Sequence, residues 1–344
     1  MKKALLYEKT GKDNIVGCFL CAHRCRIKEG QLGVCRVRKN INGDLYSLNY
    51  DKVATTHLDP IEKKPLYHFL PASTSYSIAT MGCNFRCKFC QNYSLSIVET
   101  EALIVGENIP PEKLVKEALN SGSESISYTY SEPTIYFELM LDTAKLAKER
   151  GLKNVMVTNG YMTPEALEMM APYLDAANID LKAFRDSFYK ETCSARLAPV
   201  LETIKGMKAK GIWVELTTLL IPGLNNDKQE IRELIDFIVS VDNEMPWHVS
   251  RFFPQYKLLD VPVTPTEDIY EALEMGRDMG LKYVYAGNVA DGQFASTRCP
   301  SCNTVLIERI SYSTRVKKLS DGKCTSCGHA IAGVWGGAPT LFAQ

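Results

Sequence analysis

Three cysteines lie within eight residues in the stretch GCNFRCKFCQN, residues 82–92, which follows the apolar residues 75–81. They are Cys83, Cys87 and Cys90, spaced as CxxxCxxC. A disulfide framework uses an even number of cysteines in a short secreted chain, and a structural zinc site uses four ligands. Three clustered thiols fit neither site. The stretch therefore indicates a metal centre that keeps one coordination position open.

The composition fits a globular chain with a large core and no net charge. Of the 344 residues, 45% are hydrophobic and 23% are charged, as is ordinary for a soluble domain. Forty Lys and Arg residues balance forty Asp and Glu residues, so no basic field attracts a polyanion such as nucleic acid. No apolar run is long enough for a membrane span, and the N-terminal stretch holds only three consecutive strongly apolar residues, so we expect no export signal. We therefore expect a cytoplasmic protein that does not contact a membrane.

The remaining cysteines also point to metal sites. Eleven of the twelve cysteines fall into three tight groups. In a reducing compartment, such groups bind metals more often than they form disulfides. Cys193 stands alone, and we assign it no role because a single cysteine is most often a small buried apolar residue.

The N-terminal group predicts a small module held together by a metal. Its members are Cys18, Cys21, Cys25 and Cys35. Asn42-Gly43 marks a hairpin turn shortly after them. A segment of about 45 residues is too short for a stable apolar core by itself. We expect zinc at these thiols and keep as the alternative an iron–sulfur cluster that relays electrons.

The C-terminal group has the spacing of a zinc ribbon. Two CxxC pairs, Cys299 with Cys302 and Cys324 with Cys327, are separated by 21 residues, which is typical of four thiolates on zinc, with a one-iron site as the alternative. The same region suggests a second class of function, a metal-stabilised module that binds RNA or a protein partner. The basic residues that suggest it are Arg309, Arg315, Lys317, Lys318 and Lys323. The absence of net charge counts against this alternative.

Between these groups, short apolar runs alternate with longer amphipathic ones. The expected strands are residues 75–80, 125–130, 154–158, 177–181, 214–220, 248–253 and 282–286. The expected helices include 111–122, 163–174 with a Thr163 cap before Pro164, and 264–280 with a Thr264–Glu267 capping box. Strand–helix alternation predicts an α/β fold with a parallel sheet, and six or seven units over about 210 residues favour a partial barrel. Functional residues in such a fold gather at the C-terminal ends of the strands.

The expected organisation has four parts: a Cys-rich module at 1–50, a connecting strap at 51–74, a partial (βα)6-type parallel barrel at 75–290, and a zinc-ribbon-like module at 291–344. Three prolines in the strap argue against a continuous helix there. Because the strap leads directly to the cysteine triad, we expect His57, Asp59 and Lys63 or Lys64 to border the site entrance. The alternative is a strap that only packs beside the first strand.

Three thiolates hold three irons of a [4Fe–4S] cube and leave the fourth iron open, whereas a cube that only carries electrons takes four. The triad, with the aromatic Phe89 before its last cysteine, resembles the signature of the radical S-adenosylmethionine superfamily. The resemblance implies that the open iron binds S-adenosylmethionine. It also implies reductive cleavage of this cosubstrate to a 5′-deoxyadenosyl radical, with Cys83, Cys87 and Cys90 as the essential catalytic ligands.

The ends of the expected strands supply further candidate residues. The second strand ends in Tyr130-Ser131-Glu132, similar to the Gly-Gly-Glu-Pro motif of the superfamily with Tyr-Ser in place of Gly-Gly. Thr158-Asn159 ends the third strand, and Asp180 and Lys182 lie on one side of the fourth. The resemblance implies that S-adenosylmethionine is bound by Phe89, Tyr130, Ser131, Glu132, Thr158, Asn159, Asp180, Lys182 and His248. For Asp180 and Lys182 the alternative is a surface ion pair, and for His248 it is a residue after Pro254 or a structural pairing.

Over most of its length the chain resembles the radical enzymes of the AmmeMemoRadiSam system and pyruvate formate-lyase activating enzyme. The motifs that carry this resemblance include CxLCxHxC, DPIEKKPLYHF, YTYSEPT, IDLKAF, LIPGLNND and HVSRFFP. It implies an oxidoreductase that takes hydrogen from a protein, as in glycyl-radical activation, from a peptide or from a small molecule. RNA also fits as the substrate. A donor of low-potential electrons is implied as a partner.

Overall fold

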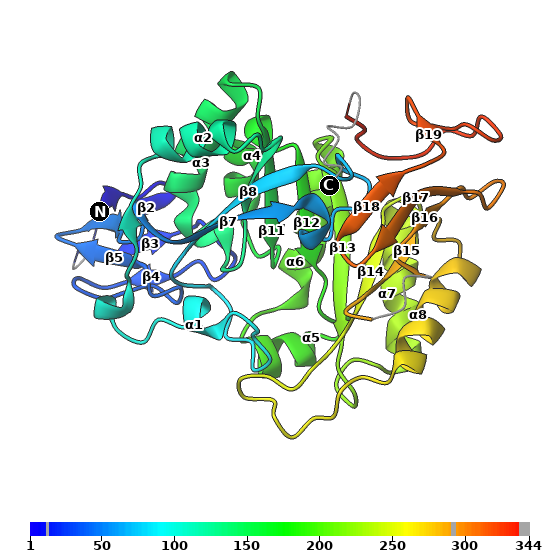
Figure 1. Ribbon diagram of the computed structural model, residues 1–344. Coiled ribbons are helices and arrows are strands. Elements are labelled where there is room, and N and C mark those ends of the chain that lie inside the picture. The colour runs from blue at the N-terminus through cyan, green and yellow to red at the C-terminus, as the bar shows by residue number, and fades with distance from the viewer. Residues whose placement is uncertain (12–13, 290–293, 337–344) are drawn as a thin grey trace.

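Seven parallel strands form the centre of the computed structural model, which describes residues 1–11, 14–289 and 294–336 (Figure 1). In sheet order they are β8 (Thr74–Thr80), β10 (Ser125–Tyr128), β11 (Lys153–Thr158), β12 (Ala176–Asp180), β13 (Trp213–Leu220), β14 (Trp247–Arg251) and β15 (Val284–Gly287). Each strand pairs in parallel with the next one along the chain. The predicted α/β class with a mostly parallel sheet is therefore confirmed, and all seven expected strands are present.

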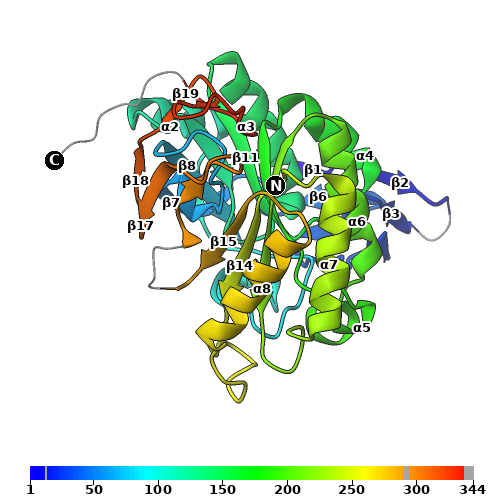
Figure 2. The same ribbon diagram turned by 90° about the vertical axis from the view of Figure 1, so that its right-hand side faces the viewer.

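Amphipathic helices cover the outside of this sheet, and Figure 2 shows α6, α7 and α8 on the side that faces the viewer. The longer helices are α2 (Pro111–Asn120), α3 (Phe137–Glu149), α4 (Pro164–Met170), α6 (Leu197–Ala209), α7 (Lys228–Val241) and α8 (Thr266–Asp278). Two short helices are α1 (Tyr93–Ser96) and α5 (Asp186–Phe188). Helix α2 packs on α3, α4 on α6, and α7 on α8.

One predicted helix start is confirmed and one is wrong. The Thr163 hydroxyl accepts a hydrogen bond from the Ala166 amide at 3.2 Å, and Pro164 is the first residue of α4. The Thr264–Glu267 capping box does not form. The Thr264 hydroxyl instead donates to the carbonyl of Leu220 at 2.6 Å and accepts from the Phe252 amide at 3.1 Å. These tertiary hydrogen bonds take the place of the local cap, and α8 begins two residues later.

The strap contributes a strand that the sequence analysis did not expect. Strand β7 (Lys52–Pro60) pairs antiparallel with β8, and β9 (Glu107–Asn108) pairs antiparallel with β7 at the edge. Beyond β7 the chain crosses the inner face of the sheet, where the Asn178 side-chain amide donates to the Pro65 carbonyl at 2.8 Å. The apolar side chains of this segment, among them Leu66 and Phe69, cluster with Val155 and Ala176 near the starts of β11 and β12. The strap thus packs where β11 and β12 begin, at the end of the sheet opposite the C-terminal ends of the strands.

The chain termini form small β-structures at opposite ends of the molecule (Figure 1). The N-terminal strands are β1 (Lys2–Lys3), β2 (Tyr7–Lys9), β3 (Val16–Cys18), β4 (Arg26–Ile27), β5 (Arg38–Ile41) and β6 (Asp44–Ser47). Between β5 and β6, Asn42 and Gly43 have φ values of 54° and 75°, as the predicted hairpin turn requires. The C-terminal strands are β16 (Thr297–Arg298), β17 (Val305–Ile310), β18 (Ser313–Val316), β19 (Leu319–Ser320) and β20 (Lys323–Cys324). The predicted boundary at 290/291 lies outside the described residues.

A chain of buried polar groups attaches the C-terminal strands to the strap. Arg309 donates to the Thr297 hydroxyl at 2.8 Å, which lies 2.9 Å from the Tyr285 hydroxyl, which in turn lies 2.5 Å from Nε2 of His68. Nδ1 of His68 lies 2.6 Å from the carbonyl of Ala332. Since that carbonyl only accepts, Nδ1 carries the proton and Nε2 accepts from Tyr285.

Among the helices that the structure describes, none has the length and apolar character to span a membrane.

Candidate active site

A cavity of about 470 Å³ opens at the C-terminal ends of the parallel strands. All twelve residues predicted for the catalytic triad and the cosubstrate line it: Cys83, Cys87, Phe89, Cys90, Tyr130, Ser131, Glu132, Thr158, Asn159, Asp180, Lys182 and His248. They come from segments far apart in the sequence, and the parallel sheet brings them to one edge. The volume is in the range of small-molecule sites in proteins. The arrangement is therefore that of a binding site with a three-thiol wall.

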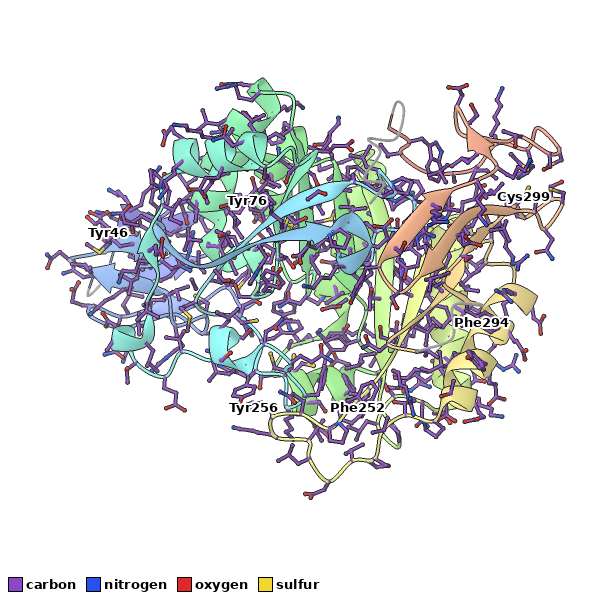
Figure 3. The ribbon with its side chains drawn as sticks, viewed as in Figure 1. Tyr46, Tyr76, Phe252, Tyr256, Phe294 and Cys299 are labelled. Carbon is purple, nitrogen blue, oxygen red and sulfur yellow. The ribbon has the colours of Figure 1, made fainter. Side chains whose placement is uncertain are left out.

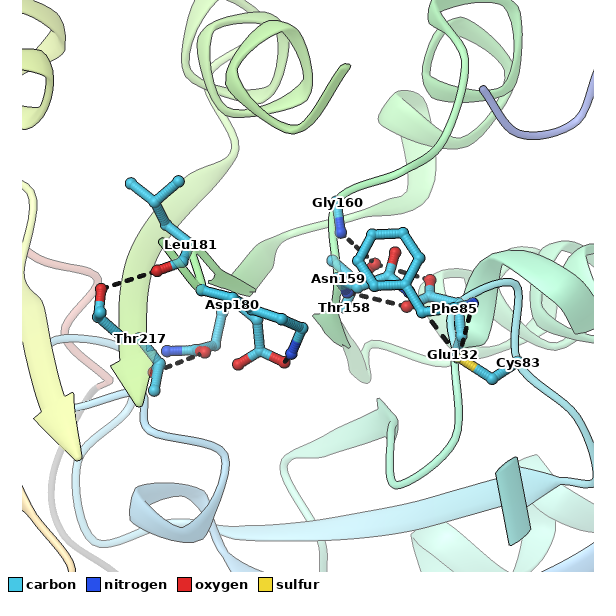
Figure 4. A network of polar contacts seen from close by, with 12 residues as sticks. Cys83, Phe85, Glu132, Thr158, Asn159, Gly160, Asp180, Leu181 and Thr217 are labelled. Atoms are coloured by element: carbon cyan, nitrogen blue, oxygen red, sulfur yellow. Dashed lines mark hydrogen bonds and ion pairs between the residues drawn. The ribbon is translucent and has the colours of Figure 1, made fainter. Parts of the chain in front are cut away.

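The three thiols form one wall of this cavity, in the loop after β8. Sγ of Cys83 accepts a hydrogen bond from the Phe85 amide at 3.3 Å, and the Asn159 side chain donates to Oδ1 of Asn84 at 2.7 Å. Figure 4 shows Cys83 and Phe85 beside Asn159 at the end of β11. Burial raises the pKa of Cys83 well above its usual value, and a bound metal cation would favour the thiolate. Three such thiols are the donor set that an iron–sulfur cluster with one open iron requires.

Cys193, to which the sequence analysis gave no role, lies directly behind the triad. Its thiol is hydrogen-bonded to Cys87, and this bond, together with burial, raises the pKa of Cys87. Cys193 ends a short π-helix, Tyr189–Cys193, whose Tyr189 hydroxyl accepts from the amide of Lys182 at 3.0 Å. Such π-turns are frequent at functional sites. Nothing in the cysteine spacing could have shown this contact, because it arises only from the tertiary fold.

Glu132 fastens the end of β10 to the end of β11. Oε1 accepts from the Thr134 amide at 3.0 Å, from the Thr134 hydroxyl at 2.6 Å and from the Thr158 hydroxyl at 2.7 Å. Oε2 accepts from the Asn159 amide at 2.8 Å. Burial raises the pKa of Glu132, although these hydrogen bonds act in the opposite direction. Because four donors occupy about all the lone-pair positions of a carboxylate, Glu132 positions the walls of the cavity.

Tyr130 stands where the superfamily motif has glycine, and its backbone adopts a conformation that favours glycine. Its φ is 64°, in the left-handed region. The Tyr130 carbonyl accepts from the Asn92 side chain at 2.9 Å, and its hydroxyl donates to Asp59. Nζ of Lys64, which is 1% exposed, lies 2.6 Å from Asp59 and 4.5 Å from the centre of the Tyr130 ring. Burial lowers the pKa of Lys64 to about 8, although Asp59 acts against this shift.

The strap therefore borders the cavity. Of the strap residues predicted at the entrance, Lys63 lines the cavity directly and donates to Asp59 at 2.8 Å. Asp59 and Lys64 reach the cavity wall through Tyr130. The ring of His57 meets the edge of the Tyr130 ring at 5.7 Å between centroids. Charged strap residues thus stabilise the unusual Tyr130 conformation as well as forming the entrance.

Asp180 and Lys182 face each other on the cavity wall after β12. Nζ of Lys182 lies 2.8 Å from Oδ2 of Asp180, and 13% of the Lys182 side chain is exposed. Although burial opposes it, the charges of Asp180 and Cys87 raise the pKa of Lys182 well above its usual value. Figure 4 shows Asp180 well apart from Cys83, and both residues line the cavity. The pair is therefore a charged part of the cavity, in contrast to the alternative of a solvated surface ion pair.

His248 lines the cavity from β14 and is held by a buried carboxylate. Its Nε2 is 2.7 Å from Oε2 of Glu215. Glu215 also accepts from the amides of Tyr67 and His68, at 2.9 and 2.8 Å, and from the indole of Trp213 at 3.0 Å. Burial alone would raise the pKa of Glu215, but the hydrogen bonds and charges around it lower it. The sequence analysis missed Glu215, although its alternation with Thr217 along β13 places both on the inner face.

The two outer cysteine groups differ in geometry. Of the residues described, one group brings at least three possible metal ligands within 4.8 Å of one another, and it consists of Cys299, Cys302, Cys324 and Cys327. Sγ of Cys299 lies 3.6 Å from that of Cys327, and Sγ of Cys302 lies 3.7 Å from that of Cys324. Four thiolates at such spacing form a metal-binding group that fits a tetrahedral ion.

The N-terminal cysteines lie in and beside β3 and β4, and three of the four are buried. Cys18, Cys21 and Cys35 are at most 8% exposed, and Cys25 is half-buried. Burial and the nearby charges of Cys35, Cys18 and Cys25 raise the pKa of Cys21 well above its usual value. The four thiols are therefore close neighbours in a protected position.

The basic patch predicted around the C-terminal cysteines is smaller than expected. Arg309 is 1% exposed and donates to the Tyr67 carbonyl at 2.6 Å, so it belongs to the interior. Lys317 pairs with Glu308 at 2.7 Å. Including Arg309 in an RNA-binding surface was wrong, because its charge is used to attach the C-terminal strands to the strap.

Comparison with known proteins identifies the family. Residues 77–238 match the Radical SAM superfamily. An uncharacterized protein of Methanocaldococcus jannaschii is 45% identical over 334 residues, which cover 96% of this chain and 99% of that protein. The pyruvate formate-lyase-activating enzyme of Clostridium pasteurianum is 24% identical over 203 residues, 54% of this chain and 83% of that protein. The structural match to Streptococcus suis SuiB bound to S-adenosylmethionine covers 66% of this chain and 53% of the SuiB chain, with 17% identity and a TM-score of 0.50.

The chain therefore belongs to the radical SAM superfamily. The resemblance to this superfamily and to pyruvate formate-lyase activating enzyme, read from the triad and the strand-end motifs, is confirmed. Membership implies S-adenosylmethionine and an iron–sulfur cluster as cofactors, and the three-thiol wall fits that cluster.

Proposed function

We propose that the protein reductively cleaves S-adenosylmethionine in the cavity at the strand ends and takes a hydrogen atom from a substrate. The observation that carries the proposal is the single cavity that contains the Cys83, Cys87 and Cys90 thiols together with the Asp180–Lys182 pair. A [4Fe–4S] cluster on the three thiols supplies the electron that yields the 5′-deoxyadenosyl radical. The remaining residues bind and orient the cosubstrate and exclude water from it.

Individual roles follow from position and charge. Asp180 and Lys182 match the amine and the carboxylate of the methionyl group. Glu132 acts as a positioning residue, because its carboxylate is occupied by Thr134, Thr158 and Asn159. His248, which lines the cavity from β14 and is fixed by Glu215, is assigned to the adenosine end. In this proposal the sheet is the partial (βα)6-type barrel of the superfamily, with the terminal modules attached to it.

The substrate class is proposed more broadly than the cosubstrate. Named relatives include a pyruvate formate-lyase-activating enzyme and a GTP 3′,8-cyclase of Helicobacter pylori that is 25% identical over 265 residues, 72% of this chain and 78% of that protein. Accordingly we propose a protein, peptide or small-molecule substrate. We assign zinc to the C-terminal thiols and place the protein in the cytoplasm. None of the twelve cysteines forms a disulfide, which fits a reducing compartment.

The test is formation of 5′-deoxyadenosine by anaerobically reconstituted, dithionite-reduced protein. The wild-type protein is expected to form it from S-adenosylmethionine, and Cys87→Ala is expected to form none because one iron loses its ligand. Cys302→Ala is the matched control, since it removes a thiol from the distant C-terminal group. Equal product from wild type and Cys87→Ala would contradict the proposal.

A further inference from the structure

We propose that Cys18, Cys21, Cys25 and Cys35 hold a second iron–sulfur cluster, and that electrons reach the cluster of the cysteine triad through it. The inference rests on the proposed function and deepens it, because it names the route by which the reducing electron enters. It departs from the zinc that the spacing of these cysteines first suggested. It rests on the contacts between the N-terminal cysteines and the triad loop.

The four thiols surround one small volume. The amide of Cys18 donates to the carbonyl of Cys25 at 2.8 Å, which joins β3 to the segment before β4. A side chain built on Gly33 would begin 3.8 Å from the sulfurs of both Cys25 and Cys35. Cys21 lies in the loop after β3, beside Cys18. The backbone therefore brings Cys18, Cys25 and Cys35 together around one small volume beside Gly33, and Cys21 follows Cys18 by three residues.

This volume lies directly against the triad loop. Gly82 precedes Cys83, and a Cβ on Gly82 would lie 3.3 Å from the Cys35 carbonyl and 2.7 Å from the side chain of Val37. Its φ is 111°, so both space and conformation require glycine. The chain thus brings the ligand-bearing residues Cys35 and Cys83 into close neighbourhood, with glycine between them.

Two further hydrogen bonds fix the N-terminal segment to the same loop. His23 lies between Cys21 and Cys25 in the sequence, and its Nε2 is 2.8 Å from the Asn84 carbonyl. Arg86 donates to the carbonyl of Val34 at 2.6 Å and to the carbonyl of Cys83 at 2.6 Å. A metal needed only to stabilise the N-terminal strands has no reason to lie at this contact. A redox centre has a reason to lie at this contact, because electron transfer to the triad cluster requires a short separation.

A buried cation touches one of the four sulfurs. Arg38 is 1% exposed, and its Nη1 lies 3.5 Å from Sγ of Cys18. Its Nη2 forms an ion pair with Glu138 of α3. Hydrogen bonds to cluster sulfurs and burial are two of the factors that set the reduction potential of such clusters. Arg38 is therefore placed to tune a redox centre.

The spacing of the sulfurs also separates the N-terminal group from the zinc-like group. The tight packing of at least three ligands within 4.8 Å is found at the C-terminal cysteines and, among the described residues, at no other group. Four thiolates on one ion come close together, whereas those on a cube stand further apart because each binds a different iron. The N-terminal cysteines share the wider arrangement with Cys83, Cys87 and Cys90.

The electron path balances with one external reductant. A low-potential one-electron donor protein reduces the N-terminal cluster, and this electron passes to the cluster of the triad. There it reduces the sulfonium of S-adenosylmethionine, and the C–S bond breaks to give methionine and the 5′-deoxyadenosyl radical. Zinc cannot take this part, because it has no accessible redox change.

Metal and sulfide analysis of the anaerobically reconstituted full-length protein tests the inference. The wild type should carry about eight irons and eight sulfides per chain, as two cubes require. The double variant Cys21→Ala/Cys35→Ala should lose about half of both and keep an electron paramagnetic resonance signal that S-adenosylmethionine changes. The triple variant Cys83→Ala/Cys87→Ala/Cys90→Ala should keep about four irons, whose signal does not respond to S-adenosylmethionine. As the control, Cys302→Ala/Cys327→Ala should lose a C-terminal metal and keep its sulfide content.

The route is tested by the rate at which a reduced ferredoxin reduces the triad cluster. In the double variant this rate should fall about tenfold or more, because the intermediate centre is lost. Wild-type protein with about four irons, N-terminal variants that lose zinc and no sulfide, or an unchanged rate would overturn the inference. Failure of the proposed function would look different. The iron content would still match the two predicted clusters, but S-adenosylmethionine would change no signal and no 5′-deoxyadenosine would form.

Discussion

The two terminal cysteine groups look alike in sequence and differ in their surroundings. Figure 3 shows Tyr46 of the N-terminal strands and Cys299 of the C-terminal group at opposite ends of the molecule. The C-terminal sulfurs are tightly packed, and Cys302 and Cys327 are exposed. The N-terminal cysteines lie against the loop of the triad and beside the buried Arg38. The chemistry of four cysteines is therefore decided by what the fold places next to them, and spacing alone does not determine it.

Both groups are attached to the sheet through a buried arginine, and the two attachments also differ. Arg38 forms a buried ion pair with Glu138 of α3. The guanidinium of Arg309 has a looser contact with Glu62, at 3.8 Å, and lies 4.1 Å from the centre of the Tyr67 ring. The N-terminal module thus depends on a close charge pair, whereas the C-terminal strands depend mainly on a hydrogen-bonded chain that runs from Arg309 to His68.

The largest expected effect comes from removing the metal of the C-terminal group. Without an ion, four adjacent thiolates no longer hold β16–β20 together, because structural metal binding contributes folding free energy. Limited proteolysis between residues 296 and 331 should become about a hundredfold faster after chelation. Mass spectrometry of the fragments locates the cuts. Cleavage that first appears in the N-terminal module would reverse the comparison between the two groups.

Next in size is the loss of the N-terminal ion pair. Arg38→Met leaves Glu138 buried without its partner and should lower the free energy of unfolding by about 4 kcal/mol. Chemical denaturation measures this change. The double variant Arg38→Met/Glu138→Leu should recover most of the loss, since both charges are then gone. A single variant within about 0.5 kcal/mol of wild type would show that the module is not attached in this way.

Acidification should weaken the C-terminal attachment through His68. Burial lowers the pKa of His68 to about 4 from an ordinary value of 6.5. As the pH falls from 6.5 to 4, the unfolded chain binds a proton at this ring and the folded chain does not. The free energy of unfolding should therefore fall by up to about 3 kcal/mol in this window. Denaturation at several pH values measures the slope, which His68→Gln should reduce. If the free energy of unfolding of His68→Gln depended on pH as steeply as that of the wild type, the pH dependence would arise from other groups.

The smallest expected effect is at Tyr130, on the cavity wall. Tyr130→Gly removes a left-handed conformation that costs about 1 kcal/mol and also removes the hydroxyl bond to Asp59, which contributes about as much. The free energy of unfolding should change by less than about 1 kcal/mol, and the affinity for S-adenosylmethionine by less than about tenfold. Calorimetry of the wild-type protein and of Tyr130→Gly checks both values. A far larger loss of affinity would give the tyrosine ring a direct part in binding.

The sequence predicted the repeated parts of the molecule well. Strand–helix alternation is a local pattern, so all seven parallel strands were found, and the parallel topology then placed Glu132, Asp180 and His248 at one edge. Contacts that need the third dimension were missed. Cys193 behind Cys87 is one example, since the cysteine spacing gives no signal of this contact. Glu215 behind His248 is another, because strand alternation places Glu215 on the inner face but only the tertiary fold pairs it with His248.

Tertiary contacts also explain the errors. Thr264 was expected to cap α8, but its hydroxyl bonds Leu220 and Phe252 across the fold. Arg309 was counted in a surface patch because charge in a sequence does not show burial. Strand β7 was missed because the strap was interpreted as an extended connection, and its pairing with β8 has no signal in the local sequence.

Electron paramagnetic resonance of the dithionite-reduced, anaerobically reconstituted protein, with and without S-adenosylmethionine, tests whether Cys83, Cys87 and Cys90 hold a cluster that binds this cosubstrate. We predict the signal of a reduced [4Fe–4S] cluster that changes when S-adenosylmethionine is added. In Cys87→Ala, no signal should respond to S-adenosylmethionine. A protein that binds no cluster at the triad, or a cluster signal that S-adenosylmethionine leaves unchanged, would contradict the assignment of the cavity.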